Sequence, residues 1–271
     1  MQESSKYGEY ISLLDKILIK YHGTHHVHSA DELRMLERKI SFEDKANILT
    51  TKLLYEGGIS MYDNLGLKAE INQRGIESLV HFTNADNIPS IIQHGILSKN
   101  ELDNQGIFYQ HNDYMRLDNN LDAISLSVTF PNYRMFFLLR KAPGSKWVVL
   151  LICPEIILSA DCLFYSTNAA NREMHSIAQN ECKTLKAFKS MFYDHDTRKT
   201  RKINDNETTD PQAEIQLVGK IPINMIKSAV FEDEVVLDQY REYLSQAHIE
   251  FTVNKEYYRP RRDYEYWRNN S

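Results

Sequence analysis

The change of hydrophobic period near Gly75 constrains the fold more than any other feature of the chain. Before it, apolar residues recur at helical spacing, as in residues 7–21 (YGEYISLLDKILIKY), and further helices are predicted from Ser29 and Ser41. After it, strand-like segments alternate with helices, and strands are predicted at SLVHFT (78–83), AISLSVTF (123–130), KWVVLLIC (146–153), DPQAEIQLV (210–218), SAVFE (228–232) and IEFTV (249–253). The pattern predicts an α+β protein with a helical N-terminal element over residues 1–75 and one mixed domain over residues 76–271.

Composition narrows the class of protein. The 271 residues carry a net charge of −5, so nucleic acid would have to bind a local patch. There is no run of about 18 apolar residues, and the start MQESSKYGEY lacks the plan of a secretory signal. We therefore expect a cytoplasmic protein with no membrane partner. The three cysteines form no CxxC pair, and YHGTHHVH (21–28) has no cysteine or spaced acid beside its histidines, so reduced thiols and no metal site are predicted.

The segment DPQAEIQLV carries a glutamate where strands rarely have one. Alternate residues of a strand share a face, so Gln212, Glu214 and Gln216 point one way, and Ala213, Ile215 and Leu217 the other. One face is polar and the other belongs to the core. Glu214 is then either a solvent-facing residue of an edge strand or a functional carboxylate.

Several motifs in order favour the functional reading of Glu214. Gln-x-Glu (212–214) after a basic loop resembles the signature of ADP-ribosyltransferases. His81-Phe82-Thr83 resembles the His-x-Thr motif of one branch of that superfamily, and Ser125-Leu126-Ser127 resembles the Ser-x-Ser motif of the other branch. More closely, LVHFTNADNIPSIIQHGILS (79–98), RLDNNLDAISLSVTFPNYRMFF (116–137), TNAA (167–170) and PQAEIQLVGKIPINMI (211–226) together resemble the DarT-type toxins that modify nucleic-acid bases. The resemblance covers roughly residues 74–253.

The resemblance implies a fold, a cofactor and a site. The fold is ADP-ribosyltransferase-like, with split antiparallel sheets, and NAD serves as ADP-ribose donor without a metal. Glu214 and Arg116 are the implied catalytic residues, and the implied NAD-binding residues are His81, Thr83, Asn87, Ser125, Ser127 and Tyr133. A carboxylate at position 214 suits this chemistry, because breaking the bond between nicotinamide and ribose builds positive charge on the ribose. The alternatives are a core histidine at 81, a packed aromatic at 133 and a solvated arginine at 116.

A basic stretch before the Gln-x-Glu strand indicates the acceptor. Residues 183–202 hold seven Lys or Arg and two Asp, an excess of +5, with aromatic residues interleaved. Cationic and aromatic side chains suit single-stranded nucleic acid, and Arg198, Lys199, Arg201 and Lys202 are its predicted ligands. The aromatic and basic tail, residues 255–268, either extends this surface or packs on the body. A solvated helix face is the alternative for the whole stretch.

We therefore predict a toxin or anti-phage effector that modifies bases of single-stranded nucleic acid. DNA is favoured and RNA is possible, since no sequence feature recognises a 2′-hydroxyl. The resemblance implies a cognate antitoxin protein. A protein-modifying ADP-ribosyltransferase and a non-catalytic nucleic-acid-binding module are the two alternatives.

Overall fold

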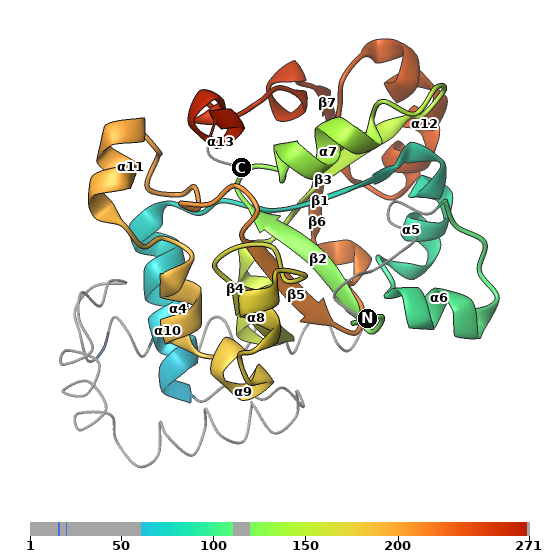
Figure 1. Cartoon of the computed structure of the whole chain (residues 1–271). Coiled ribbons are helices and arrows are strands. Elements are labelled where there is room, and N and C mark those ends of the chain that lie inside the picture. The colour runs from blue at the N-terminus through green and yellow to red at the C-terminus, as the bar shows by residue number, and fades with distance from the viewer. Residues whose placement is uncertain (1–15, 17–19, 21–60, 111–119, 270–271) are drawn as a thin grey trace.

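One seven-stranded sheet organises the domain. The computed structural model describes Lys16, Lys20 and residues 61–110 and 120–269. Arg116, the helices predicted from residues 29 and 41, and all but Lys16 and Lys20 of the helix predicted over residues 7–21 therefore lie outside the described residues. The strand order is β4-β5-β2-β1-β3-β6-β7 (Figure 1). The strands are β1 Leu79–Asn84, β2 Ala123–Val128, β3 Trp147–Ile152, β4 Asp161–Tyr165, β5 Glu214–Val218, β6 Ile226–Phe231 and β7 Glu250–Val253. The strand segments predicted from sequence are confirmed.

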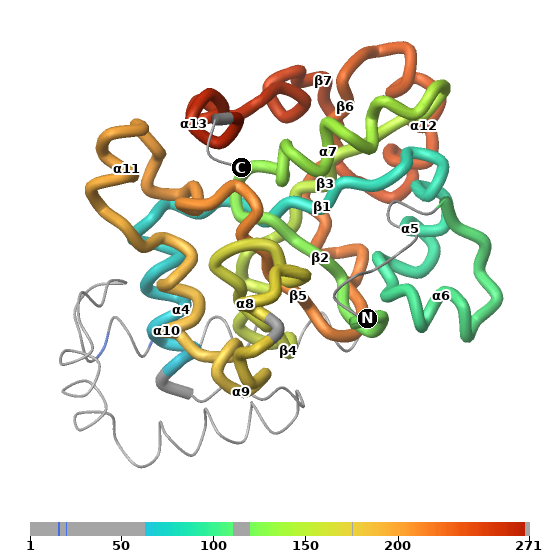
Figure 2. Tube along the Cα trace, viewed as in Figure 1, coloured from blue at the N-terminus to red at the C-terminus, as the bar shows by residue number. Residues whose placement is uncertain are grey.

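Helices surround this sheet. The α-helices are α4 Met61–Arg74, α5 Ile88–His94, α6 Lys99–Gln105, α7 Tyr133–Leu139, α8 Arg172–His175, α9 Gln179–Cys182, α10 Leu185–Ser190, α11 His195–Arg201, α12 Glu234–Gln246 and α13 Tyr264–Asn269. The 3-10 helices are η1 Ala85–Asn87, η2 Pro154–Leu158, η3 Ile223–Met225 and η4 Lys255–Tyr258. The tube in Figure 2 shows α13 near α7 and α11, and ring contacts of Tyr264 with Tyr133 and of Tyr266 with Arg201 join them. The mixed α/β class is confirmed.

The sheet is split between β1 and β2. These strands are antiparallel and pair only through Leu79 with Val128 and Val80 with Ser127. Each strand has a longer ladder on its other edge. β1 pairs with β3 along all six of its residues, and β2 pairs with β5. The expected split is therefore present. The ladders from β4 to β6 are antiparallel, as expected, and β7 adds one parallel pairing at the edge beside β6, where α12 connects the two strands.

Helix α4 belongs to the same hydrophobic core as the sheet. Leu65, Leu67 and Ile71 are fully or almost fully buried within the main cluster of apolar residues. In Figure 1, α4 lies beside α10, and the Asp63 carboxylate accepts a hydrogen bond from the Leu185 backbone N–H at 3.0 Å. The period change at Gly75 therefore marks a change of secondary structure and not an edge of the core.

The sequence predicts that Asn84 or Asp86 caps a helix after β1 that ends at Gly95, and the structure has both ends; it also has one helix that the sequence pattern did not indicate. The Asn84 side chain caps η1 through the Asp86 N–H, and Gly95 ends α5 with φ of 80°. The polar segment after Ser98 was not assigned a helix, yet it contains α6. Ser98 and Glu101 form a capping box there, in which each side chain bonds the other residue's backbone.

Gly95 gives a prediction for stability. A β-carbon at this position would lie 2.4 Å from the Ile221 carbonyl oxygen, while one at Gly144 (φ 73°) meets no atom within 4 Å. Gly144→Ala should cost about 1 kcal/mol from the left-handed backbone alone. Gly95→Ala should cost about 3 kcal/mol or more, because a steric clash adds to a backbone conformation (φ 80°, ψ −172°) that is almost restricted to glycine. Denaturant unfolding of both variants measures this difference, and equal losses would contradict the close approach.

Candidate active site

A cavity opens where β1 and β2 part. Its volume is about 290 Å³, at the lower end of the range of ligand pockets. It brings together Glu214 and five of the predicted NAD-binding residues, which are His81, Thr83, Asn87, Ser125 and Ser127. The facing edges of the two strands are not fully used by ladder hydrogen bonds, so the split exposes backbone groups as well as side chains. Residues from distant parts of the sequence therefore share one hollow.

Glu214 is the first residue of β5 and lies half-buried in this cavity. Its Oε2 accepts a hydrogen bond from the Ala169 backbone N–H at 3.2 Å, and its Oε1 contacts the Gln216 side-chain amide at 3.5 Å. Ala213 and Ile215, on either side in sequence, are buried in the core. Glu214 therefore faces the cavity while Ile215 faces the core, as predicted, but Gln212 lies in the turn before β5 and Gln216 is buried beneath the cavity wall.

The Gln216 side chain helps to hold the Glu214 carboxylate in place. Its side chain is 1% exposed, and its Oε1 accepts a hydrogen bond from the Asn120 side chain at 2.8 Å. Because this bond fixes the amide orientation, the Gln216 Nε2 donor faces Glu214. Sequence reasoning placed Gln216 on the right face without giving it this role. The alternation of faces along the strand is the sequence signal that places Gln216 beside Glu214.

His81 connects the two strands across the split. Its Nδ1 lies 3.1 Å from the Ser125 carbonyl oxygen. A carbonyl oxygen can only accept, so Nδ1 carries the hydrogen and donates. In the neutral ring, Nε2 is therefore the acceptor nitrogen. The contact also holds β1 and β2 at a fixed separation beyond their last ladder pair.

Asn87 links β1 to the segment after α6. Its Nδ2 donates to the Thr83 hydroxyl and to the Gln110 carbonyl, both at 3.0 Å, and its Oδ1 accepts from the Gln110 N–H at 2.7 Å. Asn87 and Thr83 are both buried. The pair of bonds to Gln110 closes one wall of the cavity, a role that the sequence did not reveal.

Tyr133 lies away from the cavity. Helix α7 presents Asn132 and Met135 to it, whereas Tyr133 lines a separate groove and packs edge-on against Tyr264 at 6.2 Å between centroids. The expectation that Tyr133 binds NAD therefore needs correction, and the packed aromatic is what the structure shows. The helical pattern locates α7 but does not say which side of it faces the cavity.

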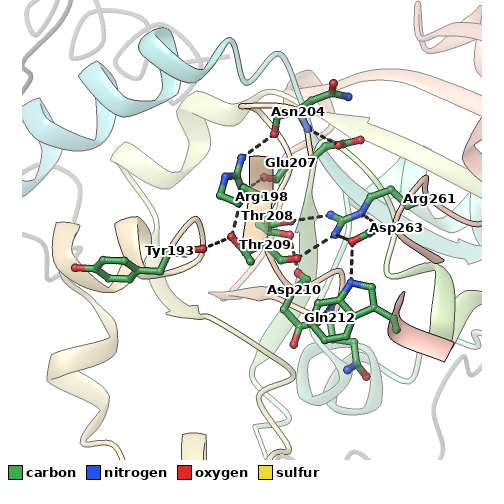
Figure 3. A network of polar contacts seen from close by, with 11 residues as sticks. Tyr193, Arg198, Asn204, Glu207, Thr208, Thr209, Asp210, Gln212, Arg261 and Asp263 are labelled. Carbon is green, nitrogen blue, oxygen red and sulfur yellow. Dashed lines mark hydrogen bonds and ion pairs between the residues drawn. The ribbon is translucent and has the colours of Figure 1, made fainter. Parts of the chain in front are cut away.

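The loop before β5, residues 204–212, is held by a buried arginine (Figure 3). Arg198 is 7% exposed, and its guanidinium donates to the carbonyls of Glu207 and Asn204, each at 2.8 Å, and to the Thr209 hydroxyl at 3.1 Å. The prediction that Arg198 binds nucleic acid is wrong, because its donors are already used by the loop. Charge counting could not show this burial.

A second buried arginine holds the same loop from the C-terminal tail. Arg261 donates to the carbonyls of Thr208 at 2.8 Å and Thr209 at 3.1 Å, and it forms a two-pronged ion pair with Asp263 (Figure 3). Burial raises the pKa of the Asp263 carboxyl, but the hydrogen bond and charge of Arg261 outweigh it and the pKa lies below its ordinary value. The Trp267 indole N–H donates to Asp263 at 2.7 Å. This part of the tail therefore packs on the body.

The other predicted nucleic-acid ligands differ in exposure. Lys199 and Lys202 are exposed, whereas the Arg201 guanidinium lies 3.0 Å from the Tyr266 ring centroid. Of the interleaved aromatics, Phe188 and Phe192 belong to the core, and Tyr193 is 65% exposed. The basic stretch is thus partly structural, and its role toward nucleic acid remains a prediction for the two lysines.

Two features are absent from the part of the chain that the structure describes. No group of three or more His, Cys, Asp or Glu side chains there could hold a metal ion. No helix there is both long enough and apolar enough to cross a membrane.

Comparison with known proteins identifies the family. The family model of the ssDNA thymidine ADP-ribosyltransferase DarT matches residues 80–259. The chain belongs to the DarT family. The matched region includes the split, the cavity and Glu214. It ends before Arg261, so the ion pair that holds the 204–212 loop lies outside it. No curated protein matches the sequence.

Solved DarT structures are similar over about two thirds of the chain. Thermosipho africanus DarTG in complex with ADP-ribose is 16% identical, with a TM-score of 0.47, over 67% of this chain and 51% of that one. Thermus sp. 2.9 DarT in complex with NAD+ is 13% identical, with a TM-score of 0.45, over 68% and 98%. The same protein in complex with ADP-ribosylated ssDNA is 14% identical, with a TM-score of 0.47, over 68% and 97%. The chain thus spans about half the length of the DarTG chain.

The hold of Arg261 on the loop can be tested by Arg261→Lys. An ammonium keeps the charge but cannot reach two carbonyls and a carboxylate together, so the free energy of unfolding should fall by about 2 kcal/mol. Arg262→Lys is the matched control, because Arg262 is exposed, and it should change stability by less than about 0.5 kcal/mol. Equal effects in chemical denaturation would count against the network.

Proposed function

We propose that the chain transfers ADP-ribose from NAD to a thymidine base of single-stranded DNA. The observation that carries the proposal is that Glu214 and His81 line one cavity, each with its orientation fixed by hydrogen bonds. Membership of the DarT family supplies the donor and the acceptor. The carboxylate, the imidazole and the surrounding hydroxyl and amide groups suit a polar dinucleotide, so the residues fit NAD.

Glu214 supplies the charge that this transfer needs. NAD provides an ADP-ribose group whose bond to the positively charged nicotinamide ring is already activated. As that bond breaks, its electron pair leaves with nicotinamide, and positive charge builds on the ribose. A carboxylate held by Ala169 N–H and Gln216 stabilises this charge without reorganising. It also accepts the proton that the attacking base loses.

The remaining cavity residues orient the donor. His81 donates through Nδ1 to Ser125, so in the neutral ring Nε2 is the nitrogen that can accept a hydrogen bond from a ribose hydroxyl. Thr83, Asn87 and Ser127 add hydroxyl and amide groups along the same walls. Lys99 lines the cavity beside them and pairs with Asp103 at 3.0 Å. It is the one Lys or Arg among the described lining residues, and it offers positive charge to the pyrophosphate together with the proposed Arg116.

The biological setting follows from this chemistry. An enzyme that marks DNA bases is harmful without control, so a toxin role with a cognate antitoxin is part of the proposal. Both substrates occur in the cytoplasm, where we place the protein. RNA as acceptor is the second candidate, and a protein acceptor is the third.

Glu214→Gln tests the proposal directly. With NAD and thymidine-containing single-stranded oligonucleotides, transfer should fall at least about 100-fold, because the amide keeps the shape but loses the charge. Glu250→Gln is the control, since Glu250 also begins a strand but is exposed. Mass analysis of the oligonucleotides measures the product. Full transfer by Glu214→Gln would refute the assignment, and labelling of RNA or protein alone would refute the acceptor.

A further inference from the structure

We propose that a groove on the other flank of α7 binds nucleotides that flank the modified base in single-stranded DNA. The inference rests on the proposed function and extends it to a second subsite. The groove has a volume of about 300 Å³ and lies between α7 and the C-terminal tail. Its aromatic walls include Tyr133, Phe137, Tyr257, Tyr264 and Trp267.

The charge of the groove matches a phosphate backbone. Four arginines line it, which are Arg134, Arg140, Arg259 and Arg268, and no described acidic residue does. Arg140 pairs with Glu232, and Arg259 pairs with Glu256. Arg134 and Arg268 form no ion pair with the described residues. In a protein of net charge −5, this concentration of unpaired cations favours a polyanion as ligand.

The aromatic rings match bases. Phe137 is 52% exposed and Tyr264 is 38% exposed, so large apolar rings face solvent beside the arginines. Every base offers a flat face to stack on such rings, and the combination of rings and cations is typical of sites for single strands. A duplex keeps its bases stacked on each other and would gain nothing from these rings.

Tyr133 lines the groove and carries a buried hydroxyl. Its side chain is 5% exposed, and its buried hydroxyl has no hydrogen-bond partner among the described residues. Burial raises the pKa of this hydroxyl, so it stays protonated and can donate. Because this hydroxyl is itself enclosed, Tyr133 contributes the surface of its ring to the groove.

The position of the groove suits a strand that leaves the cavity. One helix separates the two hollows, because Asn132 and Met135 line the cavity while Tyr133 lines the groove. Trp267, on the groove wall, donates to Asp263, the partner of the arginine that holds the 204–212 loop. A DNA strand whose reactive base lies beside Glu214 can therefore continue past the 204–212 loop into the groove.

The test measures binding of fluorescein-labelled single-stranded DNA in the absence of NAD, by fluorescence anisotropy with oligonucleotides of about 15 nucleotides, within the site size of such proteins. The double variant Arg134→Gln with Arg268→Gln should raise Kd and lower the slope of log Kd against log salt by about 1.4, as expected for two lost phosphate contacts. Tyr264→Leu should raise Kd about 5- to 100-fold through lost stacking. The control pair Lys220→Gln with Arg241→Gln removes the same charge from exposed positions elsewhere and should leave Kd and slope nearly unchanged.

The outcomes separate this proposal from the proposed function. Unchanged Kd and salt slope in the arginine pair overturn the groove as a DNA site, as does an equal change in the control pair. Tighter binding of a matched oligoribonucleotide with the same dependence on the arginines also overturns it, in favour of RNA. Transfer from NAD to DNA by the unaltered protein is measured separately, and if it occurs the proposed function stands whichever way binding falls.

Discussion

The early end of the β1–β2 ladder is the constraint on which the rest of the site depends. Two residue pairs join the strands, and then each strand continues with a different neighbour. The sheet therefore stays continuous, yet it contains an opening at its centre. A strand interior is rigid, so side chains on the two edges are held more precisely than loop residues would be. His81 bridges the opening to Ser125 and sets its width.

The reactive end of this opening is fixed by contacts from four parts of the chain. Glu214 is held by Ala169 and Gln216, and the loop that leads to it is held by Arg198 and Arg261. Buried arginines of this kind satisfy backbone carbonyls that would otherwise lose hydrogen bonds on leaving water. If the 204–212 loop contacts DNA, as the proposed function implies, its existing order keeps the loss of conformational entropy on binding small. Arg261 lies beyond the part of the chain that matches the family.

The sequence predicted the elements of the fold better than their contacts. Period and caps located β1, η1, α5 and β5, and the period of two put Glu214 on a polar face, because these signals are local. The parallel pairing of β7 and the side of α7 that faces the cavity depend on tertiary packing, which no local pattern encodes. For the same reason Tyr133 was expected to bind NAD and Arg198 to bind nucleic acid. Tyr133 instead lines the second groove, and Arg198 is buried against backbone carbonyls.

The central claim is that NAD lies in the split with its nicotinamide–ribose bond beside Glu214. A crystal structure of the Glu214→Gln variant with NAD measures this most directly, since the variant should bind the donor without consuming it. The account predicts density for the dinucleotide between β1 and β2, with the His81 Nε2 in contact with a ribose hydroxyl and the residue 214 side chain next to the anomeric carbon. Density in any other hollow, or a residue 214 side chain remote from that carbon, would contradict it.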